Sequence, residues 1–375
     1  MGGESCGARG EKGRGLAGRV RPSLASFEPY DPAFTPCRVN LSANENTHEM
    51  PEEYADAVRA SVDAALAATP LNRYPDPMAN ALRDALARRH GVSRGSIVVG
   101  NGGDEVLFNL LMAFGGPGRT LVTCPPDFSE YALFAQMTET PHVAVPRDAE
   151  DFSVDANALV AAAAGAALVI LTSPNNPTGG LLDRALLRRL LDETDALVLV
   201  DEAYVEFAPE GTSVVGLVAS EPRLVVLRTL SKAFGLAGVR AGYLVADPAV
   251  VDVLGAVRQI YSVDVLAQAA ALAAVTHRDA LAPVVADVVA ERERLSAGLS
   301  ALPGVRTWPS AGNFVLVRVA GAHRVWERLR DERSVLVRDF SSAPGLEGCL
   351  RISVGTREEN DVLLDALATL LREEA

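Results

Sequence analysis

The sequence predicts an α/β protein with a large, mostly parallel central sheet wrapped by helices and a smaller α/β domain. From about residue 80 to 250, short runs of valine, isoleucine and leucine alternate with amphipathic helical segments. Runs that are apolar throughout indicate strands buried on both faces, as in parallel sheets. After about residue 265, long helices rich in alanine, valine and arginine precede a second group of strands.

The expected elements follow in chain order. The segment Ala79–His90 carries leucines on one face and ends at Gly91, which favours a helix closed by a glycine cap. The other elements predicted in the first part are a helix at Asp104–Phe114 and strands at Ile97–Val99, Thr120–Thr123, Leu168–Thr172, Leu197–Val200, Leu224–Leu227 and Tyr243–Val245. In the second part we predict strands at Phe314–Val319, Val335–Val337 and Leu350–Val354, with helices near 323–331 and from Glu358.

These elements divide the chain into three parts. Residues 1–27 form an N-terminal arm, rich in glycine and arginine, which we expect to be flexible or to result from a start codon placed too early. Residues 28–265 form the large domain, which carries most of the motifs described below and whose first part (about 28–45) is expected to pack near the small domain and those motifs. Residues 266–375 form the small C-terminal domain.

Charge and composition exclude several classes of partner. A net charge of −13 disfavours nucleic acid and anionic membranes, because both require a basic surface. The longest apolar run, Ala158–Leu171, is shorter than the ~20 residues of a membrane-spanning helix. No metal-ligand spacing occurs among the histidines. The cysteines show no paired spacing and predict reduced thiols in a cytoplasmic protein; they are Cys6, Cys37, Cys124 and Cys349.

The run around Lys232 carries the clearest chemical signal. Thr229 and Ser231 precede the lysine, and Arg240 follows it eight positions later. An amine can form a Schiff base with an aldehyde, while two hydroxyl groups and a guanidinium can hold a phosphate. Together with the carboxylate described next, this pattern indicates pyridoxal 5′-phosphate as cofactor, with Lys232 as the residue that binds its aldehyde and later transfers a proton.

Asp201 follows the predicted strand Leu197–Val200, at the edge where open α/β sheets bind ligands. A carboxylate there would keep the pyridine nitrogen protonated. Tyr204, and Asn176 in the loop after another strand, would hydrogen-bond the 3′ oxygen of the ring. For the adjacent Glu202, a structural role as an acid that caps a helix is an equal alternative.

Three further residues lie between a strand and a helix, where backbone amides and the helix N-terminus can hold a phosphate: Gly103, Asp104 and Glu105. The glycine spacing lacks the third glycine of a dinucleotide site, so the phosphate of pyridoxal is the better ligand. Phe128 either stacks on the cofactor ring or is a core aromatic residue. Arg351, in a predicted strand, suits bidentate binding of an α-carboxylate, and Arg338 is a second candidate for the substrate.

Several segments of the chain resemble the class I/II, fold-type-I aminotransferases, and most closely the histidinol-phosphate aminotransferases among them. These segments are Asn44–Asn46, Asn72–Pro75, Gly103–Glu105, Ser173–Gly179, Asp201–Tyr204, the run around Lys232, and Leu350–Thr356. The resemblance implies a homodimer in which Tyr74 reaches the cofactor phosphate of the neighbouring subunit. It also implies that Arg351 binds the carboxylate of glutamate, and that Tyr30 and Arg338 help to hold a substrate phosphate.

The resemblance implies a ping-pong transaminase that converts histidinol phosphate and 2-oxoglutarate into imidazole acetol phosphate and glutamate, in histidine biosynthesis. Two departures concern the substrate end of the site: Thr47–Glu49 replaces the usual proline and glycine, and Phe128 replaces a tyrosine. The alternatives on the same fold are an aromatic amino-acid aminotransferase and an enzyme like threonine-phosphate decarboxylase. A cofactor-sensing regulator is disfavoured, because the chain has neither room for a DNA-binding module before residue 28 nor basic surface.

Overall fold

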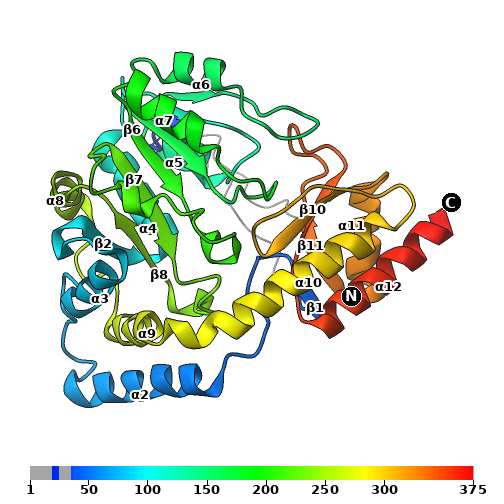
Figure 1. Cartoon of the computed structure of the whole chain (residues 1–375), viewed down its shortest axis with the longest axis horizontal. Helices are drawn as coiled ribbons and strands as arrows, with labels where there is room; N and C mark the ends of the chain where they lie inside the picture. Colours follow the sequence, from blue (N-terminus) through cyan, green and yellow to red (C-terminus); the bar gives the residue numbers. More distant parts are fainter. Residues whose placement is uncertain (1–18, 25–34, 375) are drawn as a thin grey trace.

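Two β-sheets organise this computed structural model, which describes residues 19–24 and 35–374 (Figure 1). Among the described residues, the larger sheet has seven strands, in the order β2 (Ile97–Asn101), β8 (Ala241–Val245), β7 (Leu224–Thr229), β6 (Leu197–Asp201), β5 (Leu168–Thr172), β3 (Leu121–Thr123) and β4 (His142–Ala144). Neighbouring strands run parallel except at β8, which is antiparallel to both β2 and β7. The prediction of a mostly parallel central sheet is confirmed.

Helices cover both faces of this sheet, as its apolar strands predict. In β6, Leu197 and Leu199 pack on one face, whereas Val198 and Val200 pack on the other. The first face is covered by α4 (Gly102–Phe114), α5 (Glu130–Met137) and α8 (Pro248–Val257). The second is covered by α3 (Asn80–His90), α6 (Ala156–Ala163), α7 (Arg184–Glu193) and α9 (Val265–Thr276). Each large apolar side chain buried in this way contributes about 1.5–3 kcal/mol to folding.

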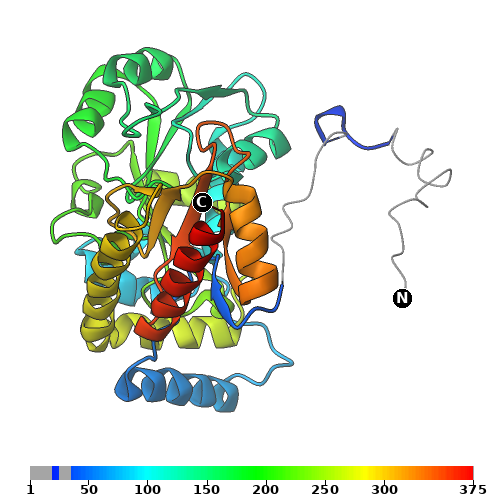
Figure 2. The ribbon, with the colours of Figure 1, turned by 90° about the vertical axis from the view of Figure 1, so that its right-hand side faces the viewer.

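The smaller sheet joins the start of the described chain to its C-terminal part. Its strand order is β1 (Val39–Leu41), β11 (Val335–Asp339), β12 (Cys349–Ser353), β10 (Phe314–Arg318) and β9 (Arg306–Thr307). Three helices lie side by side against it: α10 (Ala282–Ser300), α11 (Ala322–Arg333) and α12 (Arg357–Glu374) (Figure 2). The sequence did not predict β1, which pairs in parallel with β11.

The connection between the two sheets runs through α9 and α10. Figure 1 shows α10 extending from the large sheet to the small one, while α9 packs on α3 and on α2 (Glu52–Ala68). The division of the chain at residue 265 therefore stays a prediction, because the helix that begins there packs with the larger sheet.

Most predicted strands extend further than their apolar runs. β6 continues to Asp201, β7 to Thr229 and β11 to Asp339, and α4 begins at Gly102 instead of Asp104. The added residues are polar or are glycine, so an apolar pattern cannot reveal them. They matter because each extension brings polar groups to the space between the sheets.

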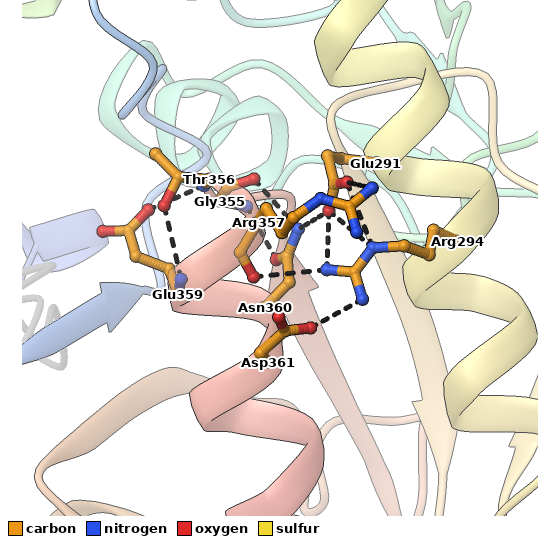
Figure 3. A network of polar contacts seen from close by, with 8 residues as sticks. All are labelled: Glu291, Arg294, Gly355, Thr356, Arg357, Glu359, Asn360 and Asp361. Atoms are coloured by element: carbon orange, nitrogen blue, oxygen red, sulfur yellow. Dashed lines mark hydrogen bonds and ion pairs between the residues drawn. The ribbon is translucent and has the colours of Figure 1, made fainter.

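A polar network fixes the start of α12 to α10 (Figure 3). The side chain of Asn360, which is fully buried, donates hydrogen bonds to Glu291 Oε2 (3.0 Å) and to the backbone oxygen of Gly355 (2.9 Å). Its own oxygen accepts a bond from the Gly355 N–H (3.0 Å). Arg294 bridges Glu291 of α10 and Asp361 of α12. The end of β12 is thus held rigidly beside the cavity described below.

Candidate functional site

A cavity of about 670 Å³ lies between the two sheets, where the carboxyl ends of β5, β6 and β7 meet. Ligands bind at this edge in open α/β sheets. The predicted residues that line it are Gly103, Asp104, Phe128, Asn176, Asp201, Tyr204, Thr229, Ser231, Lys232, Arg240, Arg338 and Arg351. The structure therefore brings together groups that lie as much as 248 positions apart, from Gly103 to Arg351.

Lys232 follows β7 and lies in the cavity wall. Its Nζ donates a hydrogen bond to the backbone oxygen of Ala43 (2.9 Å) and lies 5.8 Å from the centroid of the Tyr204 ring. Burial and the nearby Arg351 guanidinium lower the pKa of Lys232 to about 8. An amine with this pKa has an appreciable neutral fraction near neutral pH, which attack on an aldehyde requires.

Asp201 is the last residue of β6 and is buried at the base of the cavity. Tyr131 Oη donates a hydrogen bond to its Oδ2 (2.7 Å), and the Ala203 N–H donates one to its Oδ1 (2.9 Å). Burial raises the pKa of Asp201 to about 6, while these two hydrogen bonds act in the opposite direction. A carboxylate in such surroundings is suited to pair with a cationic ring N–H.

The sequence reasoning missed Tyr131, which is fully buried on α5. Its Oη lies 2.8 Å from Thr172 Oγ1 as well as 2.7 Å from Asp201 Oδ2. An ionised carboxylate cannot donate a hydrogen bond, so the phenol proton goes to Asp201 and Thr172 donates to Tyr131. The only sequence signal is its position one helical turn after Phe128, whose ring meets the Tyr131 ring edge-on at 5.6 Å.

Tyr204 and Asn176 reach the cavity from the loops that follow β6 and β5. Tyr204 Oη accepts a hydrogen bond from Asn44 Nδ2 (3.1 Å), and Asn176 Oδ1 accepts one from Arg351 Nη1 (2.6 Å). Burial raises the pKa of Tyr204, so its phenol is neutral and retains a proton to donate.

Hydroxyl, guanidinium and backbone N–H groups meet at the start of α4. Thr229 Oγ1 donates to Ser231 Oγ (2.9 Å), and Arg240 Nη2 lies 2.9 Å from Asp104 Oδ2. Gly102 has φ +85°, which side chains rarely adopt, and a Cβ atom there would lie 2.6 Å from Arg240 Nη2, so the guanidinium packs over the Gly102 backbone. The first N–H groups of a helix lack intrahelical partners and bind anions. This corner fits a phosphate group.

Two arginines line the opposite side of the cavity, on neighbouring strands of the small sheet. Arg338 of β11 and Arg351 of β12 are paired directly across the antiparallel ladder. Arg351 also donates to the backbone oxygen of Ser42 (2.6 Å). Like charges placed opposite each other in a sheet are unfavourable for folding. The pair concentrates positive charge on this side of the cavity, which suits an anion.

Two predicted residues lie elsewhere, and a third cannot be placed. Glu105 does not line the cavity; its Oε2 accepts a hydrogen bond from the backbone N–H of Asn101 (2.5 Å) at the start of α4. Tyr74 is 77% exposed and stacks on Tyr261, with 4.4 Å between the ring centroids. Tyr30 lies outside the described residues. The binding roles predicted for these three residues stay predictions.

Glu202, for which a structural role was the alternative, points away from the cavity. It is buried beside Arg228, whose Nε lies 2.8 Å from its Oε2. Its other oxygen accepts a hydrogen bond from the Val214 N–H (2.6 Å). These contacts give Glu202 a structural role behind the sheet.

The donor set fits pyridoxal phosphate. It combines a lysine of lowered pKa, a buried carboxylate, a neutral phenol and a corner suited to a phosphate, in one cavity. Each group matches a different part of that cofactor: the aldehyde, the ring nitrogen, the 3′ oxygen and the phosphate, respectively.

Comparisons with known proteins agree with this geometry. The family model of aminotransferase class I and II matches residues 38–367. A histidinol-phosphate aminotransferase of Roseiflexus castenholzii is 42% identical, over 94% of this chain and 98% of that protein. The crystal structure of histidinol-phosphate aminotransferase from Sinorhizobium meliloti in complex with pyridoxal-5′-phosphate has a TM-score of 0.84 and 27% identity, covering 95% of this chain and 98% of that one. The crystal structure of L-threonine-O-3-phosphate decarboxylase from Porphyromonas gingivalis has a TM-score of 0.77 and 27% identity, and the match covers 89% of this chain and 99% of that one.

Proposed function

Because this chain belongs to the class I and II aminotransferase family, we propose that it is a pyridoxal-phosphate-dependent transaminase acting on histidinol phosphate. It exchanges the amino group with 2-oxoglutarate, which yields imidazole acetol phosphate and glutamate, a step of histidine biosynthesis. The identity of about two residues in five to the Roseiflexus enzyme, over nearly the full length of both chains, supports this substrate.

The side chains of the cavity have separate tasks in this reaction. Pyridoxal phosphate, when bound, supplies an aldehyde that links to amines and a ring that accepts the electron pair released at the substrate α-carbon. Lys232 would hold the aldehyde end, and its free amine would move a proton at the substrate α-carbon. Asp201 would keep a proton on the ring nitrogen, and Tyr204 would donate to the 3′ oxygen.

The pairing of Arg338 with Arg351 is the structural observation that carries the substrate class. A ping-pong transaminase must bind two substrates in turn at one site. Here, these are a phosphorylated amine without a carboxylate and a dicarboxylate. Two guanidiniums side by side can bind either anion, since both phosphate and carboxylate accept bidentate hydrogen bonds from arginine.

A panel of amino donors tests the proposal. Histidinol phosphate, phenylalanine, tyrosine and threonine phosphate are each mixed with the cofactor-loaded protein, without an acceptor, and the visible absorption band is followed. We expect histidinol phosphate to convert the cofactor from its aldehyde to its amine form fastest, and 2-oxoglutarate to reverse the change. A band that histidinol phosphate leaves unchanged would exclude this substrate.

A second candidate is a decarboxylase of threonine phosphate, favoured by the likeness to the Porphyromonas enzyme. That substrate has both a phosphate and an α-carboxylate, which the paired arginines could bind together. Product analysis separates the two functions: carbon dioxide released from threonine phosphate without a keto product indicates the decarboxylase.

We predict that Tyr131→Phe makes cofactor binding more sensitive to acid. The phenol stabilises the ionised form of Asp201, so its removal raises the pKa of that carboxyl above its present value of about 6. As pH falls, the carboxylate is then protonated earlier, and the affinity of the variant for pyridoxal phosphate decreases at a higher pH than in the parent protein. Fluorescence titrations over a pH series measure the midpoint.

Tyr54→Phe is the matched control for this prediction. Tyr54 is equally buried, and its hydroxyl donates to the backbone oxygen of Phe234 (2.7 Å), outside the cavity. It should lose stability without a change in the pH midpoint. An unchanged midpoint in Tyr131→Phe would refute the link between Tyr131 and Asp201.

The exposed apolar residues around Tyr74 support a homodimer. Leu71 is 68% and Ile260 59% exposed, and both flank the stacked pair Tyr74 and Tyr261. Clusters of exposed apolar residues mark protein interfaces. Tyr74 lies on this surface, as expected if it contacts the partner's cofactor phosphate, the role that the sequence resemblance implies.

We predict that Leu71→Glu combined with Ile260→Glu gives a monomer with little transaminase activity, because the added charges cannot be buried in an interface. Light scattering measures the mass, and the assay is run on the same samples. Val143→Glu is the control: Val143 is 41% exposed on β4, at the other edge of the large sheet from β2, and its substitution should leave the dimer intact. A dimer that survives the double substitution would place the interface elsewhere.

We also propose a cytoplasmic location and, apart from the second copy of the chain, small-molecule partners without nucleic acid or membrane. Within the described part of the chain, no helix is long and apolar enough to cross a membrane. The net charge of −13 disfavours nucleic acid. Glutamate and 2-oxoglutarate, the second substrate pair, are soluble metabolites.

A further inference from the structure

Asn44, which lies beside the cavity, has a backbone conformation that is uncommon for a buried residue. Its φ is +54°, and it is 1% exposed. A residue other than glycine adopts this left-handed conformation uncommonly, although asparagine tolerates it better than most. Such a conformation in a buried residue persists only where surrounding contacts impose it. The contacts of Asn44 come from both sheets.

Two contacts attach Asn44 to the small sheet. Its backbone N–H donates to Ser353 Oγ (2.8 Å), and its backbone oxygen accepts a hydrogen bond from Asn313 Nδ2 (3.0 Å). Ser353 is the last residue of β12 and lies two positions before Gly355, which the network in Figure 3 fixes to α10. Asn44 is therefore held from a rigid part of the small sheet.

The same contacts decide which way the Asn44 amide faces. Ser353 Oγ accepts the bond from the Asn44 N–H and donates its own proton to Asn44 Oδ1 (3.0 Å). The amide nitrogen then faces Tyr204 Oη at 3.1 Å. An amide NH₂ group can only donate a hydrogen bond. The Tyr204 oxygen is thus the acceptor here, and its own proton is free to point in another direction.

We propose that Asn44 is a positioning residue that makes Tyr204 donate its proton into the cavity, toward the 3′ oxygen of the bound cofactor. This inference rests on the function proposed above. Asn44 itself acts only through Tyr204, whose ring forms part of the cavity wall. A hydrogen-bond donor behind the phenol also strengthens the phenol as a donor, because successive hydrogen bonds polarise one another.

The substitution Asn44→Asp tests the direction of the bond. Aspartate keeps the size, tolerates the left-handed conformation and still accepts from Ser353. Its carboxylate, however, accepts from Tyr204, so the phenol proton turns away from the cavity. The readout is the ratio of two affinities of the cofactor-free protein, one for pyridoxal phosphate and one for its analogue without the 3-hydroxyl group. We expect the variant to lose about tenfold in this ratio, the effect of one hydrogen bond to a charged oxygen.

Taking the ratio separates positioning from structure. A residue that only joins the two sheets would weaken both ligands equally. The charge added by aspartate also acts on the 3′ oxygen, and the uncharged variant Asn44→Gly described below separates this effect from the orientation of the phenol. Asn313→Ala is the matched control, since it removes the other bond to Asn44 and leaves the contact with Tyr204. Its ratio should equal that of the parent protein.

Two further variants keep the inference testable if Asn44→Asp does not fold. Asn44→Gly suits a positive φ and removes the amide, so the ratio should fall, but by less than in the aspartate variant. In a Tyr204→Phe background, Asn44→Asp or Asn44→Gly should change the ratio no further. If Asn44→Asp and Asn44→Gly both had the same affinity ratio as the parent protein, the proposal would be overturned. A parent protein that binds neither ligand would instead overturn the proposed function.

Discussion

Lys232→Ala should reduce transamination by ~10⁴-fold or more, because one side chain both binds the cofactor and moves the proton in the reaction. The sequence offers an unusually clean test, since Lys12 and Lys232 are its only lysines. Borohydride fixation of the bound cofactor followed by peptide mapping should label the peptide that contains Lys232. Lys12→Arg is the matched control and should retain both the label and the activity.

The lowered pKa of Lys232 makes a second measurement possible. Only the neutral amine attacks an aldehyde, and the pKa of this lysine is about 8 in the cofactor-free protein. The rate of cofactor capture should therefore rise with pH and level off above about pH 8. For a lysine of ordinary pKa, the rate would continue to rise well above that pH. Because Arg351 helps to lower this pKa, Arg351→Gln should move the midpoint to higher pH.

Two results would contradict the role of Lys232. One is turnover at the parent rate in Lys232→Ala. The other is a label found only on the peptide that contains Lys12. A capture rate that does not change with pH would contradict the lowered pKa alone.

The sequence predicted best those features that depend on local pattern. Asp201 and the run around Lys232 each follow an apolar strand, and parallel strands bring such positions to one edge of a sheet. The register pairs Thr172 of β5 with Asp201 of β6, and Lys232 follows the next strand, β7. Family membership was predicted for the same reason, because the matching segments are short and contiguous. The comparisons confirm it.

What the sequence could not predict depends on contacts between distant residues. β1 is only three residues long, and Val39 pairs with Val335 at the far end of the chain. Tyr131 acts on Asp201 across 70 positions, and Asn44 contacts Ser353 across 309. The ends of strands were also missed where polar residues continue them: Arg228 lies inside β7 because Glu202 and Glu206 pair with it there.

Asp201→Asn is the second substitution for which we expect a large effect. The amide has nearly the same shape, yet it cannot hold a proton on the ring nitrogen of the cofactor as a carboxylate can. Loss of one buried, oriented charge of this kind lowers kcat by a factor on the order of 10²–10³. Steady-state kinetics with histidinol phosphate measure the loss, and KM should change less than kcat because the carboxylate does not touch the substrate's phosphate.

Stability should change in the opposite direction, which separates chemistry from unfolding. Burial raises the pKa of Asp201 from 3.8 to about 6, so the folded protein binds this proton more tightly than the unfolded chain does. Stability should therefore fall as pH rises from about 3.8 to about 6, and above pH 6 the ionised carboxylate carries its full cost in folding free energy. The cofactor-free Asp201→Asn variant should then melt at or above the parent temperature at neutral pH while it is nearly inactive.

Asp127→Asn provides the matched control, because burial also raises the pKa of Asp127 to about 6 but its side chain does not line the cavity. Both variants should gain stability at neutral pH for the same reason, while only Asp201→Asn should lose turnover. Equal losses of kcat in the two variants would mean that a buried carboxyl group in this region, and not its position beneath the cofactor, governs the rate. If Asp201→Asn turned over at the rate of the parent protein, Asp201 would have no role in catalysis.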